Sequence, residues 1–133
     1  MKNYIDSNIF INAFIYEGVK AEKCRRIVSD VVQGKIKGVT SVLTWDEIVY
    51  SIKKLLDAEN AKISGNKFLN APKLVLAPAD RNVVLKSQYL LAKYNLLPRD
   101  AIHAATAILN DCDKIISDDS DFDNIKEIKR IGV

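Results

Sequence analysis

The stretch NYIDSNIFINAFI, residues 3–15, decides the fold because it joins a short strand directly to a short helix, with an acid at the junction. The residues up to Asp6 predict a first strand over 3–6, and those that follow predict a helix over 9–15. In parallel α/β sheets, ligands gather outside the C-terminal ends of the strands. Asp6 therefore marks the edge of the sheet at which a functional site is expected.

The rest of the chain alternates between short apolar segments and longer helical patterns, with no repeat or linker between them. The further strands are expected over 38–41, 73–77, 114–117 and 127–131. The further helices are expected over 20–34, 45–57, 59–70, 81–95 and 99–111. This alternation predicts an α/β fold, a three-layer α/β/α sandwich with a central, mainly parallel sheet of about five strands.

Local signals support several of these helix boundaries. Gly34 is a plausible stop for the helix over 20–34. Thr44 and Glu47 match a capping box that would open the helix over 45–57. Asp80 is expected to cap the following helix, and Pro98 to begin the one after it.

Composition narrows the class of protein. The chain has 133 residues, 48% of them hydrophobic and 28% charged, which predicts one globular domain over 1–133. Its net charge of +3 excludes a histone-like basic coat and leaves binding to nucleic acid open. Two distant cysteines indicate reduced thiols rather than disulfides. We find no long apolar run and no signal-peptide pattern, so we expect a cytoplasmic protein without a membrane segment.

Carboxylates recur where a doubly wound fold would bring them to one edge of the sheet. Asp6 follows the first strand, the acids of 117–121 follow the fourth, and Glu47 and Asp100 lie near the starts of two helices. Each position also has a structural explanation, as a turn former or as a charge that favours the helix dipole. Glu47 points away from its helix's apolar stripe, and the sequence leaves open whether it faces solvent or a cleft.

Asp100 is the acid that is hardest to explain structurally. Its helix is small and apolar on nearly every side, which predicts that it is buried. A buried carboxylate is costly unless a cation or hydrogen-bond donors meet it, and neighbouring carboxylates repel one another. A divalent cation resolves this conflict. Because His103 is the only histidine, the ligands would be oxygens, which favours Mg²⁺ or Mn²⁺.

At these residues the sequence resembles the PIN-domain nucleases, and among them the VapC-type ribonuclease toxins. The resemblance covers essentially the whole chain and lies in four segments that follow in order: YIDSNIFI with Asp6, TWDEI with Glu47, LPRDAIHAA with Asp100, and ISDDSDF with Asp119. It implies that these four acids are catalytic. It also implies a metal site made by Asp6, Asp100, Asp119 and Asp121.

Two positions carry an ambiguity of one residue, because Asp46 precedes Glu47 and Asp118 precedes Asp119. We assign the catalytic roles to Glu47 and Asp119. The residues expected to support the ligands or to touch the substrate are Asn8, Ser117, His103 and Arg99. We expect the histidine to support the ligands or fill the core rather than to act as a base.

The resemblance implies a Mg²⁺- or Mn²⁺-dependent endoribonuclease that leaves a 5′-phosphate and a 3′-hydroxyl. It further implies an RNA substrate, a homodimer and a small antitoxin protein as partner. Two other functions stay open: a nuclease of RNA processing or decay without an antitoxin, and a PIN-like domain that binds RNA or protein without cleaving. An EF-hand over 119–130 is excluded, because Asn124 replaces the required Gly and Arg130 the required Glu.

Overall fold

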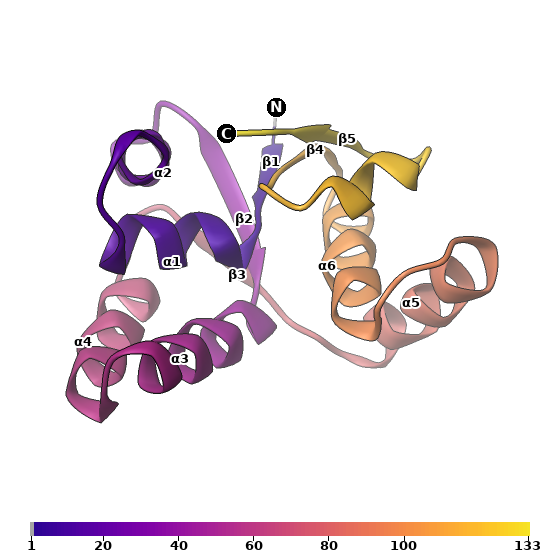
Figure 1. Cartoon of the computed structure of the whole chain (residues 1–133). Helices are drawn as coiled ribbons and strands as arrows, with labels where there is room; N and C mark the ends of the chain where they lie inside the picture. The colour runs from indigo at the N-terminus through magenta and orange to yellow at the C-terminus, as the bar shows by residue number, and fades with distance from the viewer. Residues whose placement is uncertain (1) are drawn as a thin grey trace.

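The computed structural model describes residues 2–133, in which five strands form one parallel sheet in the order β3-β2-β1-β4-β5 (Figure 1). All four pairs of neighbouring strands are parallel. The strands are β1 (Lys2–Ile5), β2 (Lys37–Ser41), β3 (Val75–Ala77), β4 (Cys112–Ile116) and β5 (Lys129–Ile131). These observations confirm the expected parallel sheet of five strands.

Helices cover both faces of this sheet, with α1 to α4 on one side and α5 and α6 on the other (Figure 1). The helices are α1 (Ser7–Ile15), α2 (Val19–Val32), α3 (Leu43–Leu55), α4 (Ala58–Leu69), α5 (Arg81–Lys93), α6 (Pro98–Leu109) and the 3-10 helix η1 (Ser120–Asn124). The three-layer α/β/α sandwich predicted from the sequence is therefore confirmed. No helix in residues 2–133 combines the length and the apolar character needed to cross a bilayer.

The central strand β1 contributes to both hydrophobic cores. Successive residues of a strand point to opposite faces. Tyr4 accordingly packs in the core with α5 and α6, whereas Ile5 packs in the core with α1 to α4, and both are fully buried. A strand buried on both faces is a continuous apolar run, which explains why these residues do not alternate with polar ones.

Three local predictions are confirmed and one is wrong. Asp80 caps α5 by accepting the N–H of Val83, and Pro98 begins α6. Gly34 ends the α2 region with a φ of +78°, a conformation that glycine adopts without strain.

The capping box at Thr44 is the prediction that is wrong. Helix α3 begins at Leu43, two residues before the predicted start at 45, and the N–H of Leu43 donates to the Ser41 hydroxyl oxygen at 3.0 Å. Thr44 is buried inside the helix, and its hydroxyl lies 2.7 Å from that of Thr40. Because a single residue joins β2 to α3, the helix starts early, and Glu47 falls beyond its first turn.

The order of the strands fixes where a site can form. Strand β1 lies between β2 and β4, and the helices that lead into these two neighbours cover opposite faces of the sheet. The strand order therefore reverses between β1 and β4, and the region at the C-terminal ends of these two strands, called the crevice below, is where sheets of this kind bind ligands. The N–H of Asp6 donates to the carbonyl of Ile116 at 3.0 Å, so these two strands end at the same level.

Candidate active site

Asp6 directly follows β1 and caps α1. Its Oδ1 accepts the N–H of Ser7 at 2.8 Å. Its Oδ2 accepts the Ser117 hydroxyl at 2.6 Å and the Asn8 amide at 3.2 Å. Only 4% of the residue is exposed, and this burial raises its pKa above the ordinary value despite the opposing effects of His103 and the hydrogen bonds. Asp6 is thus a buried carboxylate that hydrogen bonds hold in place at the C-terminal end of β1.

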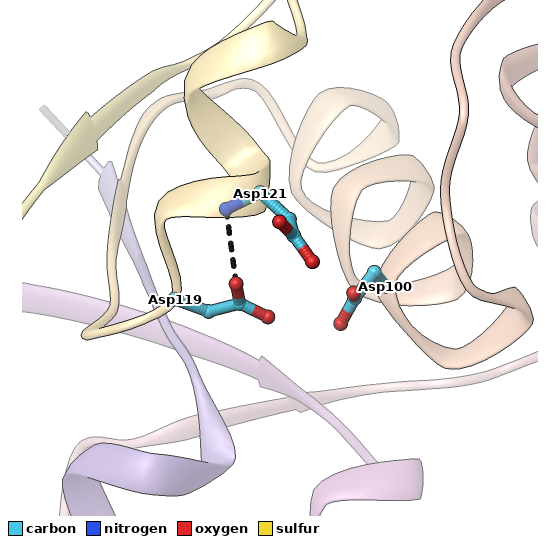
Figure 2. A group of neighbouring side chains, drawn as sticks. All are labelled: Asp100, Asp119 and Asp121. Atoms are coloured by element: carbon cyan, nitrogen blue, oxygen red, sulfur yellow. Dashed lines mark hydrogen bonds between the residues drawn. The ribbon is translucent and has the colours of Figure 1, made fainter.

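Three further acids lie near it and converge on one another, as Figure 2 shows for these three: Asp100 from the first turn of α6, and Asp119 and Asp121 from the segment that follows β4. Each offers one oxygen, and the three oxygens lie within 4.8 Å of one another. The N–H of Asp121 donates to Asp119 Oδ1 at 2.9 Å, which shapes the turn that carries both residues.

Asp100 is the acid whose environment calls for a cation. Its Oδ2 is buried and has no hydrogen-bond partner among residues 2–133. Burial, followed by the negative charges of Asp119 and Asp6, raises its pKa to about 6. A partnerless buried oxygen in a group of carboxylates fits an oxygen-ligated divalent ion, the type of ion that the sequence predicts.

The three-oxygen group does not include Asp6, one of the four predicted metal ligands. Asp6 is nevertheless close enough for its charge to raise the pKa of Asp100. The fold therefore brings Asp100, Asp119 and Asp121 together and places Asp6 next to them.

Glu47 faces the crevice and not the bulk solvent, which answers the question that its helical position left open. Its carboxylate hydrogen-bonds with Nε2 of His103, and its side chain is 17% exposed. The same Nε2 lies 3.8 Å from Asp6 Oδ1. The imidazole therefore stands between two of the four predicted catalytic acids and one helical turn from a third, Asp100.

His103 is itself almost fully buried and has a second partner, the Tyr4 hydroxyl, at 2.6 Å from Nδ1. Burial alone would lower the pKa of this histidine. The hydrogen bond with Glu47 and the negative charges of Asp6 and Glu47 act the other way, and the net effect is a raised pKa. His103 therefore contacts the Glu47 carboxylate and lies in the core.

Ser117 and Asn8 join the two sides of the crevice. The Ser117 hydroxyl donates to Asp6 and accepts the N–H of Asp119 at 3.0 Å and the Asn8 amide at 3.2 Å. Asn8 also accepts the N–H of Asp118 at 3.3 Å. These bonds hold the segment after β4 against the start of α1.

The remaining predicted residue, Arg99, lies at the exposed rim. Its guanidinium is 3.7 Å from Asp46, so Asp46 faces a surface cation. Asp118 likewise faces Lys20, at 2.6 Å. Neither of these two acids belongs to the three-oxygen group of Figure 2.

Tyr4 is the residue near the site that sequence reasoning missed. It follows the pattern of a core strand, and its partner His103 is 99 positions away in the chain. Its hydroxyl was the only available signal, because a buried tyrosine hydroxyl requires a polar partner.

Ser117→Ala is expected to destabilise the chain by about 1–3 kcal/mol, because the mutation removes one hydrogen bond from the buried Asp6 carboxylate and leaves the Asp119 N–H without a partner. Urea unfolding measures the effect. Ser29→Ala is the control, because the Ser29 hydroxyl meets only the Gln33 side chain on the exposed surface of α2. Equal stabilities of the two variants would contradict the role given to Ser117.

The sheet is parallel and doubly wound, and carboxylates gather where its strand order reverses, between β1 and β4. These features define the class of protein as an α/β domain with an acidic site suited to a divalent metal. The comparisons place the chain within that class. The family model of the PIN domain matches residues 4–128, and the chain belongs to the PIN-domain family. PIN domains are typically nucleases.

Solved structures agree with this assignment at low sequence identity. VapBC2 from Rickettsia felis, bound to a DNA fragment of its promoter, matches with a TM-score of 0.78 at 14% identity, over 99% of this chain and 98% of that one. The sarcin-ricin loop cleaving toxin VapC20 of Mycobacterium tuberculosis matches with a TM-score of 0.78 at 10% identity, over 93% and 95% of the two chains.

A DNA-bound VapBC from Salmonella typhimurium matches with a TM-score of 0.75 at 16% identity, over 99% of this chain and 98% of that one. No curated protein matches the chain significantly in sequence. The structural likeness shows that the chain has the fold of VapC toxins.

Proposed function

We propose that this chain is a Mg²⁺- or Mn²⁺-dependent endoribonuclease with Asp6, Glu47, Asp100 and Asp119 as its catalytic acids. The observation that carries the proposal is the buried, partnerless Oδ2 of Asp100 within the three-oxygen group. Uncompensated carboxylates at this density oppose folding, and a bound cation would offset this cost by pairing with them. The PIN family makes hydrolysis of a phosphodiester the expected reaction.

The metal ligands in this proposal are Asp100, Asp119 and Asp121, with Asp6 at their edge. A divalent ion supplies positive charge for the phosphodiester and lowers the pKa of the attacking water. The chain's own contribution is to hold the carboxylate oxygens in place. Helix η1 orients Asp121, and the Ser7 N–H and the Ser117 hydroxyl orient Asp6.

The assignments at the two doubled positions follow from the partners of each acid. Glu47 reaches His103 in the crevice, whereas Asp46 faces Arg99 at the rim. Asp119 lies in the three-oxygen group, whereas Asp118 faces Lys20. These contacts support Glu47 and Asp119 as the functional members of each pair.

Exposed cations border the proposed site. Lys20 and Arg99 have side chains that are 50% and 58% exposed, and each lies beside an acid flanking the crevice. An RNA phosphate that approaches would meet these cations before it reaches the acids. This arrangement supports RNA as the substrate.

We further propose that the chain works in the cytoplasm as the toxin of a VapBC-type pair, as a homodimer held by an antitoxin. The solved relatives include toxin–antitoxin complexes. The chain also has exposed apolar side chains on two sides, which support two protein contacts. Those on α3 and α4 include Trp45, Tyr50, Leu55, Ile63 and Leu69, and those on α5 are Val84, Leu85 and Tyr89.

The decisive experiment is hydrolysis of end-labelled single-stranded and structured RNA by the purified chain. We expect cleavage with Mg²⁺ or Mn²⁺, none with EDTA, and products that carry a 5′-phosphate. Asp6→Asn is expected to abolish cleavage. Cleavage that persists in EDTA or in this variant would contradict the proposed site.

The same experiment separates the remaining functions. RNA that is bound but never cut would identify a non-cleaving RNA-binding domain. Cleavage without a small antitoxin encoded beside the gene would indicate a nuclease of RNA processing or decay. Light scattering of the chain alone, and with a neighbouring antitoxin where one is encoded, measures the proposed homodimer and complex.

A further inference from the structure

Tyr4 and His103 make a fully buried polar contact beside the acids. Only 0% and 1% of these residues are exposed, and the Tyr4 oxygen lies 2.6 Å from His103 Nδ1. The rings meet edge to face, with their centroids 5.7 Å apart. The backbone N–H of Ser41, at the end of β2, donates to the same Tyr4 oxygen at 3.0 Å. Tyr4 is thereby held from two sides.

These contacts determine which nitrogen of His103 carries a proton. In the neutral imidazole one nitrogen donates and the other accepts. The Glu47 carboxylate can only accept, so Nε2 carries the proton; in the neutral ring Nδ1 then accepts the Tyr4 O–H, while the Tyr4 oxygen accepts the Ser41 N–H. In the charged imidazole both nitrogens donate, and Nε2 again carries a proton. In both states the Nε2–H donates to the Glu47 carboxylate.

We propose that Tyr4 and His103 form a positioning pair that holds the Glu47 carboxylate beside Asp6 in a single orientation. The pair bridges the layers of the fold, because Tyr4 comes from the sheet, His103 from α6 on one face and Glu47 from α3 on the other. A glutamate side chain at a crevice edge otherwise samples several rotamers, and ordering it has an entropic cost. A buried donor fixed by a second hydrogen bond orients the carboxylate before substrate arrives.

The inference deepens the proposed function and rests on it only for the part that concerns catalysis. The same hydrogen bonds also stabilise the fold, so loss of stability in a variant proves nothing about positioning. The tests below therefore use readouts that a purely structural role would leave unchanged: the protonated nitrogen of His103 and the dependence of its effect on Glu47.

The first test reads the imidazole directly in the metal-free chain. His103 is the only histidine, so a long-range ¹H–¹⁵N spectrum of the labelled protein contains the signals of one imidazole. At alkaline pH, where the ring is neutral, we expect a proton on Nε2 and an acceptor at Nδ1. Tyr4→Phe is expected to shift the Nδ1 signal and to allow exchange between the two tautomers.

Tyr94→Phe is the matched control, because it removes a tyrosine hydroxyl whose hydrogen bond goes to Glu127 at an exposed position and not to His103. It is expected to leave the imidazole signals unchanged. A proton on Nδ1 in the wild-type chain, or a Tyr4→Phe spectrum identical to the wild type, would overturn the inference.

The second test is a double-mutant cycle in RNA cleavage. His103→Ala is expected to lower kcat about 10–100-fold with little change in KM, as is common for residues that orient a functional ligand. His103→Gln retains an N–H donor and is expected to restore part of kcat. In the Glu47→Gln background, His103→Ala is expected to cause no further loss. Losses that multiply in the double variant would show that His103 does not act through Glu47.

The two experiments separate failure of the inference from failure of the proposed function. If the wild-type chain cleaves no RNA, the proposed function fails, and the imidazole spectrum alone decides whether the pair exists. If RNA is cleaved but Nε2 carries no proton, the nuclease stands and the positioning pair is wrong. Should His103→Ala not fold, Tyr4→Phe replaces it in the cycle.

Discussion

Asp100→Asn is expected to abolish RNA hydrolysis and, at the same time, to make the metal-free chain more stable at neutral pH. Asp100 sits in the three-oxygen group with one buried oxygen that has no partner. Its loss removes a proposed metal ligand, and we expect kcat to fall at least about 100-fold. The substitution also removes a negative charge that is disfavoured by burial and by the negative charges of Asp119 and Asp6.

The size of the stability gain follows from the pKa. A rise from 3.8 to about 6 corresponds to at most about 3 kcal/mol, and solvent screening at a half-buried group reduces the gain to about 1–2 kcal/mol. Urea unfolding in EDTA near neutral pH measures it. Asp113→Asn is the control, since Asp113 is exposed on β4. An active or a destabilised Asp100→Asn variant would contradict the assignment of Asp100 as a ligand.

The metal-free chain is expected to lose stability as the pH rises through the range in which Asp100 ionises. Between pH 3.8 and about pH 6, Asp100 holds its proton in the folded chain more than in the unfolded chain. This contribution of Asp100 to stability is therefore lost as the pH rises. Asp6 acts in the same direction, because its pKa is also raised. His103 acts in the same direction at higher pH. Its contribution to stability is present below the ordinary pKa of histidine and is lost as the pH rises through the raised pKa of the folded state.

Two surface carboxyls oppose this trend, because ion pairing or hydrogen bonding lowers the pKa of Asp123 and Glu127. The contributions of Asp123 and Glu127 cancel when the free energy of unfolding of Asp100→Asn is compared with that of the wild type, so the difference isolates the contribution of Asp100. We expect this difference to grow between acidic and neutral pH in EDTA. A difference that is independent of pH would show that Asp100 ionises normally.

Saturating Mn²⁺ is expected to restore the stability that the metal-free chain loses as the pH rises. A ligand present at 100 times its Kd stabilises the folded state by about 2.7 kcal/mol. The stabilisation should be large at neutral pH and small at acidic pH, where the ligand carboxyls are protonated. Asp100→Asn should abolish most of it. Equal stabilisation of both proteins by Mn²⁺ would place the ion elsewhere.

Much of the fold was predictable from local patterns. The apolar strand that ends at Asp6, the cap at Asp80 and the proline that begins α6 are signals carried by a few adjacent residues, and the structure confirms them. The capping box at Thr44 had a valid local pattern but was wrong. The tight connection from β2 starts α3 early and gives Thr44 a buried partner in Thr40.

The sequence by itself determined how strands and helices follow one another along the chain, and the four segments whose acids follow the PIN pattern. Only the tertiary structure decided that Glu47 and not Asp46 turns to the crevice, that Asp100 is left with a partnerless oxygen, and that Tyr4 reaches His103. The reason is physical. Backbone hydrogen bonding and helical periodicity depend on neighbours in the chain, whereas the partner of a buried polar group is set by how the layers pack, and here it lies up to 111 residues away.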